Sequence, residues 1–360
     1  MYFVNNPTGN QLGGSLSMTD NLLLPAKTLA EEAREARGRF DAALAQTGVS
    51  PSIQDADLIA QAFGLSPFVA QACIRHPRMA VELLSSGDLQ RSYSSEGFAH
   101  RLDDRLAGAP EITVDQEAWL VWLQNHLRRF RRREMVRIAW RDLTGLSDFH
   151  ETVADLSALA DACINAAVER LHAHLAVIHG QPGWPDPSAA PSAPPAHQRM
   201  VVLGMGKLGA RELNFSSDID LIFAYPLAGN TVGGTRPLTN DGFFTRLARL
   251  VIKALGATTV DGFVFRVDTR LRPFGDGGPL VMSFDAMEDY YQQQGREWER
   301  YALIKARVVA GRPEAGRELL ERLKPFVYRR YLDFGAFESL REMKGKIVQE
   351  VKRLGLAGNI

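Results

Sequence analysis

The sequence has little cysteine, no long apolar run and no excess of charge of either sign. Two cysteines among 360 residues exclude a disulfide scaffold and a CxxC metal site. Cys73 and Cys163 stand in apolar, helix-like surroundings, so we expect buried thiols in a reducing compartment. No apolar run reaches the ~18 residues of a membrane-spanning helix, and residues 1–17 lack the basic start and apolar middle of a signal peptide. These absences predict a cytoplasmic protein with no membrane partner.

Charge is balanced over the whole chain, with 42 Lys and Arg against 42 Asp and Glu. No global field therefore draws the protein to nucleic acid, and any anion that it binds must be held by local charge. One stretch, residues 127–141, combines seven arginines with aromatic side chains, a pattern found in nucleic-acid binding. Helical spacing spreads these arginines around the helix. We therefore favour a surface that meets acidic groups of a neighbouring domain or a partner protein.

Composition along the chain predicts an α+β fold that is predominantly helical, with roughly two domains expected from the length. The expected segments are a disordered leader (1–17), an N-terminal helical region (18–179), a Pro/Ala-rich linker (180–199), a domain with a small mixed sheet (200–310) and a C-terminal helical region (311–360). Within the sheet domain, strands are expected at 200–204, 220–224 and 263–268, and an amphipathic helix at 242–256. The last helices are expected at 284–295, 296–307, 313–328 and 337–355.

The motif GMGKLGARELNFSSDID (204–220) carries the most chemical information. Gly204, Gly206 and Gly209 follow a predicted strand and open a helix, so backbone N–H groups can approach a phosphate without a side chain intervening. The pattern is similar to a dinucleotide-binding fingerprint, but that fingerprint requires an acidic residue about 20 positions further on. Here the acids arrive sooner and as a pair, which favours a different phosphate chemistry.

Asp218 and Asp220 stand at alternate strand positions, so both carboxylates point to one face. They repel each other unless a cation lies between them, and Mg²⁺ typically takes a couple of carboxylates together with phosphates and water. A solvated turn is the simpler interpretation of two such acids taken alone. A third acid shifts the balance toward a metal site.

That third acid lies in VFRVDTRLRPFG (264–275). Alternation places four charged residues on one face of this predicted strand: Arg266, Asp268, Arg270 and Arg272. Such a face is costly to build without a bound anion. Three carboxylates can hold two cations ~3.5–4 Å apart, and guanidinium groups neutralise phosphates. We therefore expect two Mg²⁺ ions on Asp218, Asp220 and Asp268, with the arginines binding phosphate.

Three further polar residues are weaker candidates for phosphate or nucleotide binding. Lys207 follows the glycines directly, but an exposed helical lysine explains it equally well. Ser217 could donate to a phosphate oxygen or cap a turn. Lys305 could serve the site or belong to a helix face paired with Glu299. The spacing of His172, His174 and His179 suits no single helix face, so no zinc site is predicted.

Several of these motifs together resemble a known family. The glycines, the short helix, S-S-D-x-D on a strand and a later Asp are similar to the nucleotidyltransferase superfamily typified by DNA polymerase beta. More closely, four stretches resemble the glutamine synthetase adenylyltransferase family, from about residue 66 to the end: GMGKLGARELNFSSDIDLIF, DGFVFRVDTRLRPFGDGGPLV, DYYQQQGREWERYALIKARVVAG and REMKGKIVQEVKRLGLAGNI. Members of that family carry two nucleotidyltransferase domains, one adding AMP to a tyrosine of glutamine synthetase and one removing it.

NFSSDIDLIF and GREWERYALIKAR are similar to the N-terminal, adenylyl-removing copy. The adding copy typically reads GYGSDLD at the place that corresponds to NFSSDID, and this sequence does not. The resemblance implies that 200–310 is the catalytic domain of a fragment lacking the adding half. It also implies Mg²⁺-dependent phosphorolysis of tyrosyl-AMP, in which inorganic phosphate attacks and ADP leaves. Glutamine synthetase would be the substrate and a uridylylated PII signal protein the regulator.

Within that mechanism, Asp268 is either the third metal ligand or the group that orients the attacking oxygen. Arg270 and Arg272 hold phosphate groups, and Arg266 is a further candidate. Two alternatives stay open. The chain could be an adenylyl-adding domain that uses ATP, or a transferase acting on RNA ends or a small molecule. It could also be an inert regulatory binding module that needs the missing half.

Overall fold

A computed structural model describes residues 26–48, 56–94, 96–111, 116–184 and 196–328, with seven positions between 341 and 353. The predicted leader, the middle of the predicted linker and most of the predicted helix at 337–355 lie outside the described residues. The chain divides into two compact units, residues 1–87 and 88–360. Among the described residues, no helix combines the length and the hydrophobicity that crossing a bilayer requires.

The first unit is helical throughout its described part. Its helices are α1 (Ala26–Ala45), α2 (Ala56–Leu65), α3 (Pro67–Arg75) and α4 (Pro77–Ser85). The Ser66 side chain accepts a hydrogen bond from the backbone N–H of Val69 and so caps α3, and a proline occupies the first position of both α3 and α4. Proline fits there because that backbone N–H would have no helical partner. Cys73 is buried in this unit, as predicted.

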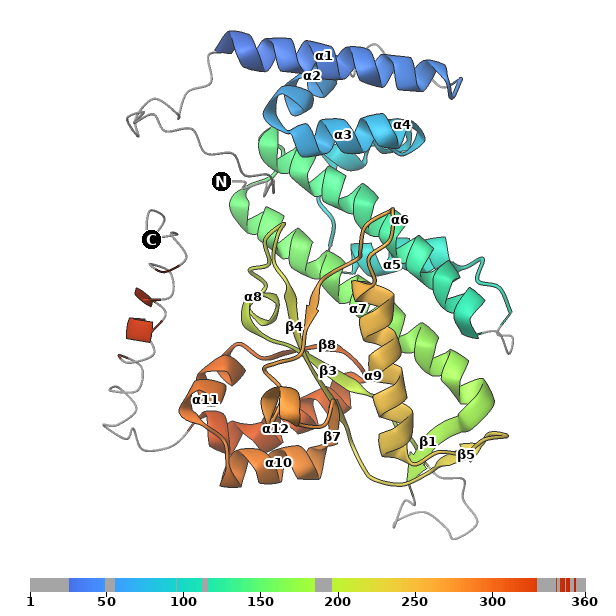
Figure 1. Ribbon diagram of the computed structural model, residues 1–360, viewed down its shortest axis with the longest axis vertical. Helices are drawn as coiled ribbons and strands as arrows, with labels where there is room; N and C mark the ends of the chain where they lie inside the picture. Colours follow the sequence, from blue (N-terminus) through green and yellow to red (C-terminus); the bar gives the residue numbers. More distant parts are fainter. Residues whose placement is uncertain are drawn as a thin grey trace. The chain divides into compact units, whose positions relative to one another are not determined.

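The second unit begins with a 3₁₀ turn and three helices, drawn in Figure 1. These elements are η2 (Asp88–Gln90), α5 (Gly97–Leu106), α6 (Gln116–Leu143) and α7 (Phe149–His179). The Asp148 side chain caps α7 by accepting from the Glu151 backbone N–H. Helix α6 is buried on nearly every side over its second half, which makes it a core helix and not a surface one.

The central sheet has five strands and is mixed, as predicted. Its strands are β3 (Val201–Gly204), β4 (Ile219–Tyr225), β6 (Val267–Asp268), β7 (Val281–Ser283) and β8 (Arg307–Ala310). The order is β6-β4-β3-β8, with β7 following β6 along the same edge of β4. Strand β3 runs antiparallel to β4 and β8, whereas β6 and β7 run parallel to β4.

Helices cover both faces of this sheet (Figure 1). They are α9 (Asn240–Gly256) on one side, with α7, and α10 (Phe284–Gln293), α11 (Glu297–Ile304) and α12 (Pro313–Val327) on the other. Alternate residues of β4 enter two separate cores. Leu221 and Phe223 pack with α7 and α9, whereas Ile222 and Ala224 pack with α10, α11 and α12.

The structure differs from the predicted linker at both of its ends. Strands β1 (Gly180–Trp184) and β2 (Ala196–His197) form a three-stranded antiparallel sheet with β5 (Thr231–Gly233), in the order β2-β1-β5. Gly180 ends α7 with φ +81°, and a Cβ there would lie 2.3 Å from the Val232 carbonyl oxygen. Glycine therefore lets the chain turn from helix into strand at this close contact. Because α6, α7 and the central sheet share one core, the boundary between units falls at Gly87 and not in this segment.

Two predicted elements are shorter than expected. The strand predicted at 263–268 is reduced to Val267–Asp268, because the backbone N–H groups of Val264 and Phe265 both donate to the Leu255 carbonyl at the end of α9. The helix predicted at 296–307 ends at Ile304, and its last residues turn into β8.

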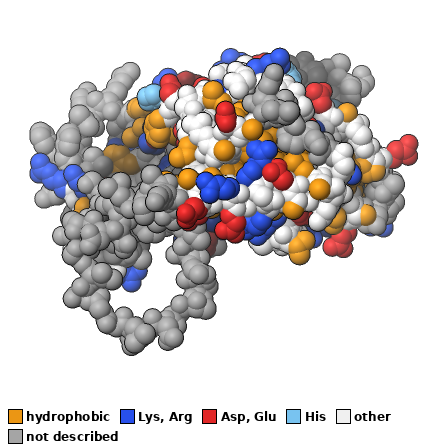
Figure 2. All heavy atoms as spheres, turned by 90° about the horizontal axis from the view of Figure 1, so that it is seen from above, with side chains coloured by type: hydrophobic (Ala, Val, Ile, Leu, Met, Phe, Trp, Pro, Cys, Tyr) orange, Lys and Arg blue, Asp and Glu red, His pale blue; other side chains and the backbone are white. Residues whose placement is uncertain are grey.

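Four of the seven arginines of 127–141 do not form the predicted surface. Arg128, Arg133, Arg137 and Arg141 are buried, and the acids that pair with the last three belong to the same unit. On the face drawn in Figure 2, basic and acidic side chains are interspersed, in keeping with the net charge of +0.

Candidate active site

Two of the three predicted carboxylates lie side by side in the sheet. Strands β4 and β6 are parallel, and their register pairs Asp220 with Asp268. Register partners on neighbouring strands point to the same face. The local backbone is fixed by hydrogen bonds from Met205 N–H to the Asp220 carbonyl and from Ile219 N–H to the Arg266 carbonyl, both 2.9 Å. Residues 48 positions apart in sequence are thereby brought together.

Among the described residues, none forms an ion pair with the Asp220 carboxylate. No described residue donates a hydrogen bond to its carboxylate, which is half-buried. Burial raises the pKa of Asp220, and the negative charges of Asp268 and Asp218 raise it further, against an opposing effect of Arg270. A carboxylate held among like charges is unfavourable by itself, and a bound cation would relieve the repulsion.

The other two carboxylates are paired with arginines. Arg266 donates to Asp218 and, over 2.7 Å, to the Ser216 carbonyl. The backbone N–H and the Nε of Arg270 each donate a hydrogen bond to the Asp268 carboxylate, at a distance of 2.8 Å. The Arg270 hydrogen bond holds the pKa of Asp268 below its ordinary value.

These pairings decide how the acids fit a metal. Over the described part of the chain, no three His, Cys, Asp or Glu side chains are arranged to share one ion, because two of the three acids are turned toward guanidinium groups. The oxygen donors still match what Mg²⁺ binds, and Asp220 is the acid whose charge is left uncompensated. The chemistry of these donors therefore fits a divalent cation, but Asp218 and Asp268 would have to turn from their arginine partners to join Asp220 in holding it.

The glycine turn lies directly against Asp220. Helix α8 (Gly206–Gly209) is a single turn that begins after β3, and Gly206 has φ +53°. A Cβ at Gly206 would lie 3.1 Å from the Asp220 Oδ2 atom, and one at Gly209 would lie 1.9 Å from the Lys305 carbonyl oxygen. Glycine is therefore required for the turn to pack between the acid and the start of β8. Gly204 is likewise confined, since a Cβ there would lie 2.7 Å from the Val309 side chain.

Helix α7 supports this turn from behind. The Arg307 guanidinium binds both carboxylate oxygens of Asp161 at 2.7 and 3.0 Å, and it donates to the carbonyls of Leu208 (2.9 Å) and Gly209 (3.2 Å). Nearby on the same helix, the Ser157 hydroxyl accepts from the Leu213 backbone N–H at 3.2 Å. The position of the glycine turn thus depends on Asp161 and Ser157 of α7, which lie more than 40 residues away in sequence.

Other predicted residues lie in local contacts. Lys207 is exposed. The Ser217 hydroxyl donates to the Asn214 side chain, within its own turn. Lys305 pairs with Glu212 at 2.9 Å, and not with Glu299 as the helical interpretation predicted.

Arg272 departs from the predicted exposed face. It is buried, and its guanidinium donates to the Thr269 carbonyl (2.9 Å) and the Asp276 carbonyl (3.2 Å). The Arg272 N–H also donates to the Thr269 carbonyl, so the chain turns there and the strand alternation ends. Arg266 and Arg270 are the exposed guanidinium groups beside the acids.

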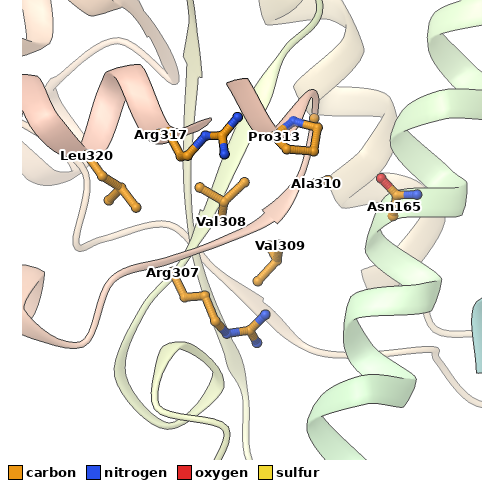
Figure 3. A pocket seen from close by; sticks show the side chains of 9 residues that line it. Asn165, Arg307, Val308, Val309, Ala310, Pro313, Arg317 and Leu320 are labelled. Atoms are coloured by element: carbon orange, nitrogen blue, oxygen red, sulfur yellow. The ribbon is translucent and has the colours of Figure 1, made fainter. Parts of the chain in front are cut away.

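One cavity, of about 420 Å³, opens beside the edge strand β8 (Figure 3). It is lined mainly by apolar groups such as Val308 and Leu320, with Asn165, Arg307 and Arg317 as polar members. None of the three predicted carboxylates lines it. The candidate site at the acids is therefore separate from this cavity.

Sequence reasoning missed the supporting residues. Asp161 lies in an evenly helical segment with no motif around it, and its partner Arg307 is 146 residues away. The one indication in the sequence was that Asp161, an acid, occupies a helical position on the inner face of α7. The arginine that pairs with it could be identified only from the fold.

Comparisons with known proteins match the part of the chain that contains these residues. The family model for glutamate-ammonia ligase adenylyltransferase matches residues 56–322. The bifunctional glutamine synthetase adenylyltransferase/adenylyl-removing enzyme of Nitrosococcus oceani is 52% identical over 324 residues, which cover 89% of this chain and 32% of the relative.

Two relatives of the same printed name give a similar result. The one from Pseudomonas aeruginosa is 51% identical over 350 residues, covering 96% of this chain and 34% of the relative. The one from Pseudomonas syringae pv. tomato is 54% identical over 300 residues, covering 82% and 28%. The chain thus spans about a third of the length of the curated relatives that it matches, and it belongs to the glutamate-ammonia ligase adenylyltransferase family.

Proposed function

We propose that this chain is an adenylyl-removing nucleotidyltransferase: it transfers the AMP group of adenylylated glutamine synthetase to inorganic phosphate, which leaves as ADP. The relatives carry both an adding and a removing activity in their names. The stretch NFSSDID (214–220) favours the removing one, because it resembles that copy and lacks the GYGSDLD of the adding copy.

The chemistry asks little of a general base. An oxygen of inorganic phosphate bonds to the AMP phosphorus, the bond from that phosphorus to the tyrosine oxygen breaks, and ADP and a tyrosine hydroxyl result. Phosphate is already an anionic nucleophile, so the main obstacle is repulsion between two anions. Exposed guanidinium groups of Arg266 and Arg270, beside the acids, can lower that repulsion.

Asp218, Asp220 and Asp268 would hold Mg²⁺, which supplies neutralising positive charge where negative charge accumulates. Of the three, Asp220 carries the argument: it pairs in register with Asp268 and has no cationic partner among the described residues. Arg266 and Arg270 would then exchange part of their pairing with Asp218 and Asp268 for phosphate oxygens. Lys207 and Ser217 stay secondary candidates, and Lys305 and Arg272 are less suited because their charges are engaged by Glu212 and by the 269–276 loop.

The test is to incubate the chain with AMP-modified glutamine synthetase, with and without phosphate and Mg²⁺, and to measure ADP. We expect ADP only when both are present, and none from the variant Asp218→Asn at unchanged thermal stability. ATP-dependent labelling of unmodified glutamine synthetase would instead identify an adding domain. Activity near wild type in Asp218→Asn would remove that acid from the site.

Regulation by a uridylylated PII protein and a cytoplasmic location complete the proposal. The PII regulation follows from the family resemblance and the location from the sequence composition; no described surface is assigned to PII. Adding uridylylated PII to the same assay tests the first: the rate of ADP release should rise. An unchanged rate would place the PII-responsive surface outside this chain.

A further inference from the structure

Phe274 has an unusual backbone for an aromatic residue. Its φ of +62° and ψ of 6° lie in the left-handed region, where bulky side chains are rare because Cβ approaches the neighbouring carbonyl. In addition, the ring is 48% exposed. A strained conformation persists only when the surrounding structure enforces it, and such positions cluster at functional sites.

The surrounding structure does enforce it. A Cβ at Gly278 would lie 2.7 Å from the Phe274 Cβ and 2.3 Å from the Pro273 carbonyl, so only glycine allows the loop to close. The buried Arg272 guanidinium spans the same loop and joins Thr269 to Asp276. These contacts fix the backbone of the loop at Phe274.

The ring also rests on a fixed support. Its centroid lies 4.3 Å from that of Tyr290, with the planes tilted by 58°. The Tyr290 hydroxyl donates to Glu299 at 2.8 Å, and Glu299 in turn accepts from the Arg296 backbone N–H at 2.9 Å. Tyr290 belongs to the core that covers one face of the central sheet.

Asp220 points to the same face of the central sheet. It lies at an alternate position of β4 with Ile222 and Ala224, and these two residues pack in the same core as Tyr290. The loop is close to the acids along the chain as well. A Cβ at Gly275 would lie 3.8 Å from the Arg270 carbonyl oxygen, and the Arg270 side chain binds Asp268. Phe274 therefore carries a half-exposed aromatic ring that packs on Tyr290, in a loop whose backbone lies next to that of Arg270.

We propose that Phe274 is the stacking platform for the purine base of the nucleotide whose phosphates lie at the acids. This inference rests on the proposed function, because it needs an adenine nucleotide at Asp220 and Asp268. A base offers a flat π surface, and an aromatic side chain of fixed orientation binds it without a loss of side-chain freedom. The ring is thus a binding residue and takes no part in bond making.

The test compares binding of ADP with binding of pyrophosphate, which keeps two phosphates and lacks the base, by calorimetry in the presence of Mg²⁺. Phe274→Leu keeps an apolar side chain against Tyr290 and the same backbone cost, but it removes the aromatic face. We expect it to weaken ADP binding by roughly 5- to 150-fold, the usual range for one base–aromatic stack, and to leave pyrophosphate binding unchanged. Phe274→Tyr should bind ADP as the wild type does.

A matched control is Phe149→Leu, which alters another exposed phenylalanine, at the start of α7; it should change neither affinity. Equal weakening of ADP and pyrophosphate in Phe274→Leu would mean that the loop only positions phosphate groups, and would overturn the inference. So would an altered KM for AMP-modified glutamine synthetase at unchanged ADP affinity, which indicates protein docking. If the wild type binds no ADP at all, the proposed function itself fails. If it binds ADP and Phe274→Leu binds equally well, only the stacking role falls.

Discussion

Two charged regions of the second unit differ in how their charged side chains are paired. In the helical region, guanidinium groups of α6 are buried against acids and carbonyls. Arg133 pairs with Asp88 at 2.5 Å, and Arg137 pairs with Asp155 at 3.0 Å. The Arg137 guanidinium also lies 3.5 Å from the centroid of the Tyr93 ring. Three of the four buried guanidinium groups, those of Arg133, Arg137 and Arg141, are neutralised by an acid at close range, whereas Arg128 donates to the Ala257 carbonyl.

The sheet edge is arranged differently. Asp220 is partly buried next to two further acids, and the charge of Arg270 only partly offsets their effect, because the pKa of Asp220 stays raised. Asp218 and Asp268 do have arginine partners, but those pairs are exposed to solvent, where ion pairs contribute little to stability. The comparison indicates that the α6 charges serve the fold, whereas the sheet-edge charges are available for a ligand. Experiments that separate stability from activity can break or sharpen this contrast.

The largest effect is expected from Asp220→Asn. Loss of the central carboxylate should lower the rate of ADP release by roughly 10⁴-fold, equivalent to about 5 kcal/mol of transition-state stabilisation. Stability should be unchanged or higher, because a charge that repels its neighbours is removed. Enzyme assay and thermal denaturation of the same sample check both. A variant that loses stability while keeping its activity would assign Asp220 to the fold.

Arg137→Met should show the reverse behaviour. It leaves Asp155 buried without its partner, and breaking a buried pair in this way costs about 3–5 kcal/mol. Urea denaturation measures the free energy of unfolding, and ADP release per folded molecule should stay near wild type. The matched control is Arg170→Met, whose exposed pair with Asp103 is worth about 0–1 kcal/mol. Similar losses in both variants would show that the buried network is not special.

Acid should weaken the fold through His172. Burial lowers its pKa from 6.5 to about 4, so the folded protein keeps the ring neutral while the unfolded chain binds a proton. Stability from this group is therefore complete above pH 6.5, falls as the pH drops toward 4, and is reduced by up to about 3 kcal/mol. His172→Gln should lose this part of the pH dependence, as measured by urea denaturation between pH 7 and 4. A curve parallel to that of the wild type would contradict the assignment.

The smallest effect is expected at the support of the glycine turn. Arg307→Lys keeps the charge but cannot bind Asp161 and two carbonyls at once, so the turn should shift slightly and ADP release should fall about tenfold. Amide hydrogen exchange over residues 206–213 should speed up, and this readout does not depend on activity. The control is Arg317→Lys on the other side of the cavity, which should leave both unchanged. Exchange at the wild-type rate would rule out the positioning role.

Much of the fold was predictable because the elements that matter are amphipathic or short and apolar. Strands β3 and β4 and helices α9, α10 and α12 lie close to their predicted ranges. The strand flanks of the proline-rich segment were not predictable. Strand β1 reads GQPGW, with glycine and proline where strands favour branched and aromatic residues. It forms a strand because β2 and β5 pair with it on both sides.

Of the candidate site, the position of Asp268 beside Asp220 agrees with the sequence prediction. Alternation along one strand is a local property, and it predicts Asp218 and Asp220 on one face. The prediction for Arg272 was wrong because alternation was extended past Asp268 into residues that form a turn. The Asp161–Arg307 support was out of reach, since nothing local links two residues on different elements.

By itself, the sequence determined which chemistry is available: three acids, neighbouring arginines, a glycine turn that admits close backbone approach, and enough of the family's motifs to identify its relatives. Tertiary structure decided which charges are neutralised. The α6 arginines and the sheet-edge acids are both charged runs in the sequence, and nothing local distinguishes them. Their difference arises because burial makes an unpaired charge costly, and only the packing of α6 against α7, and of β6 beside β4, determines which charges are paired.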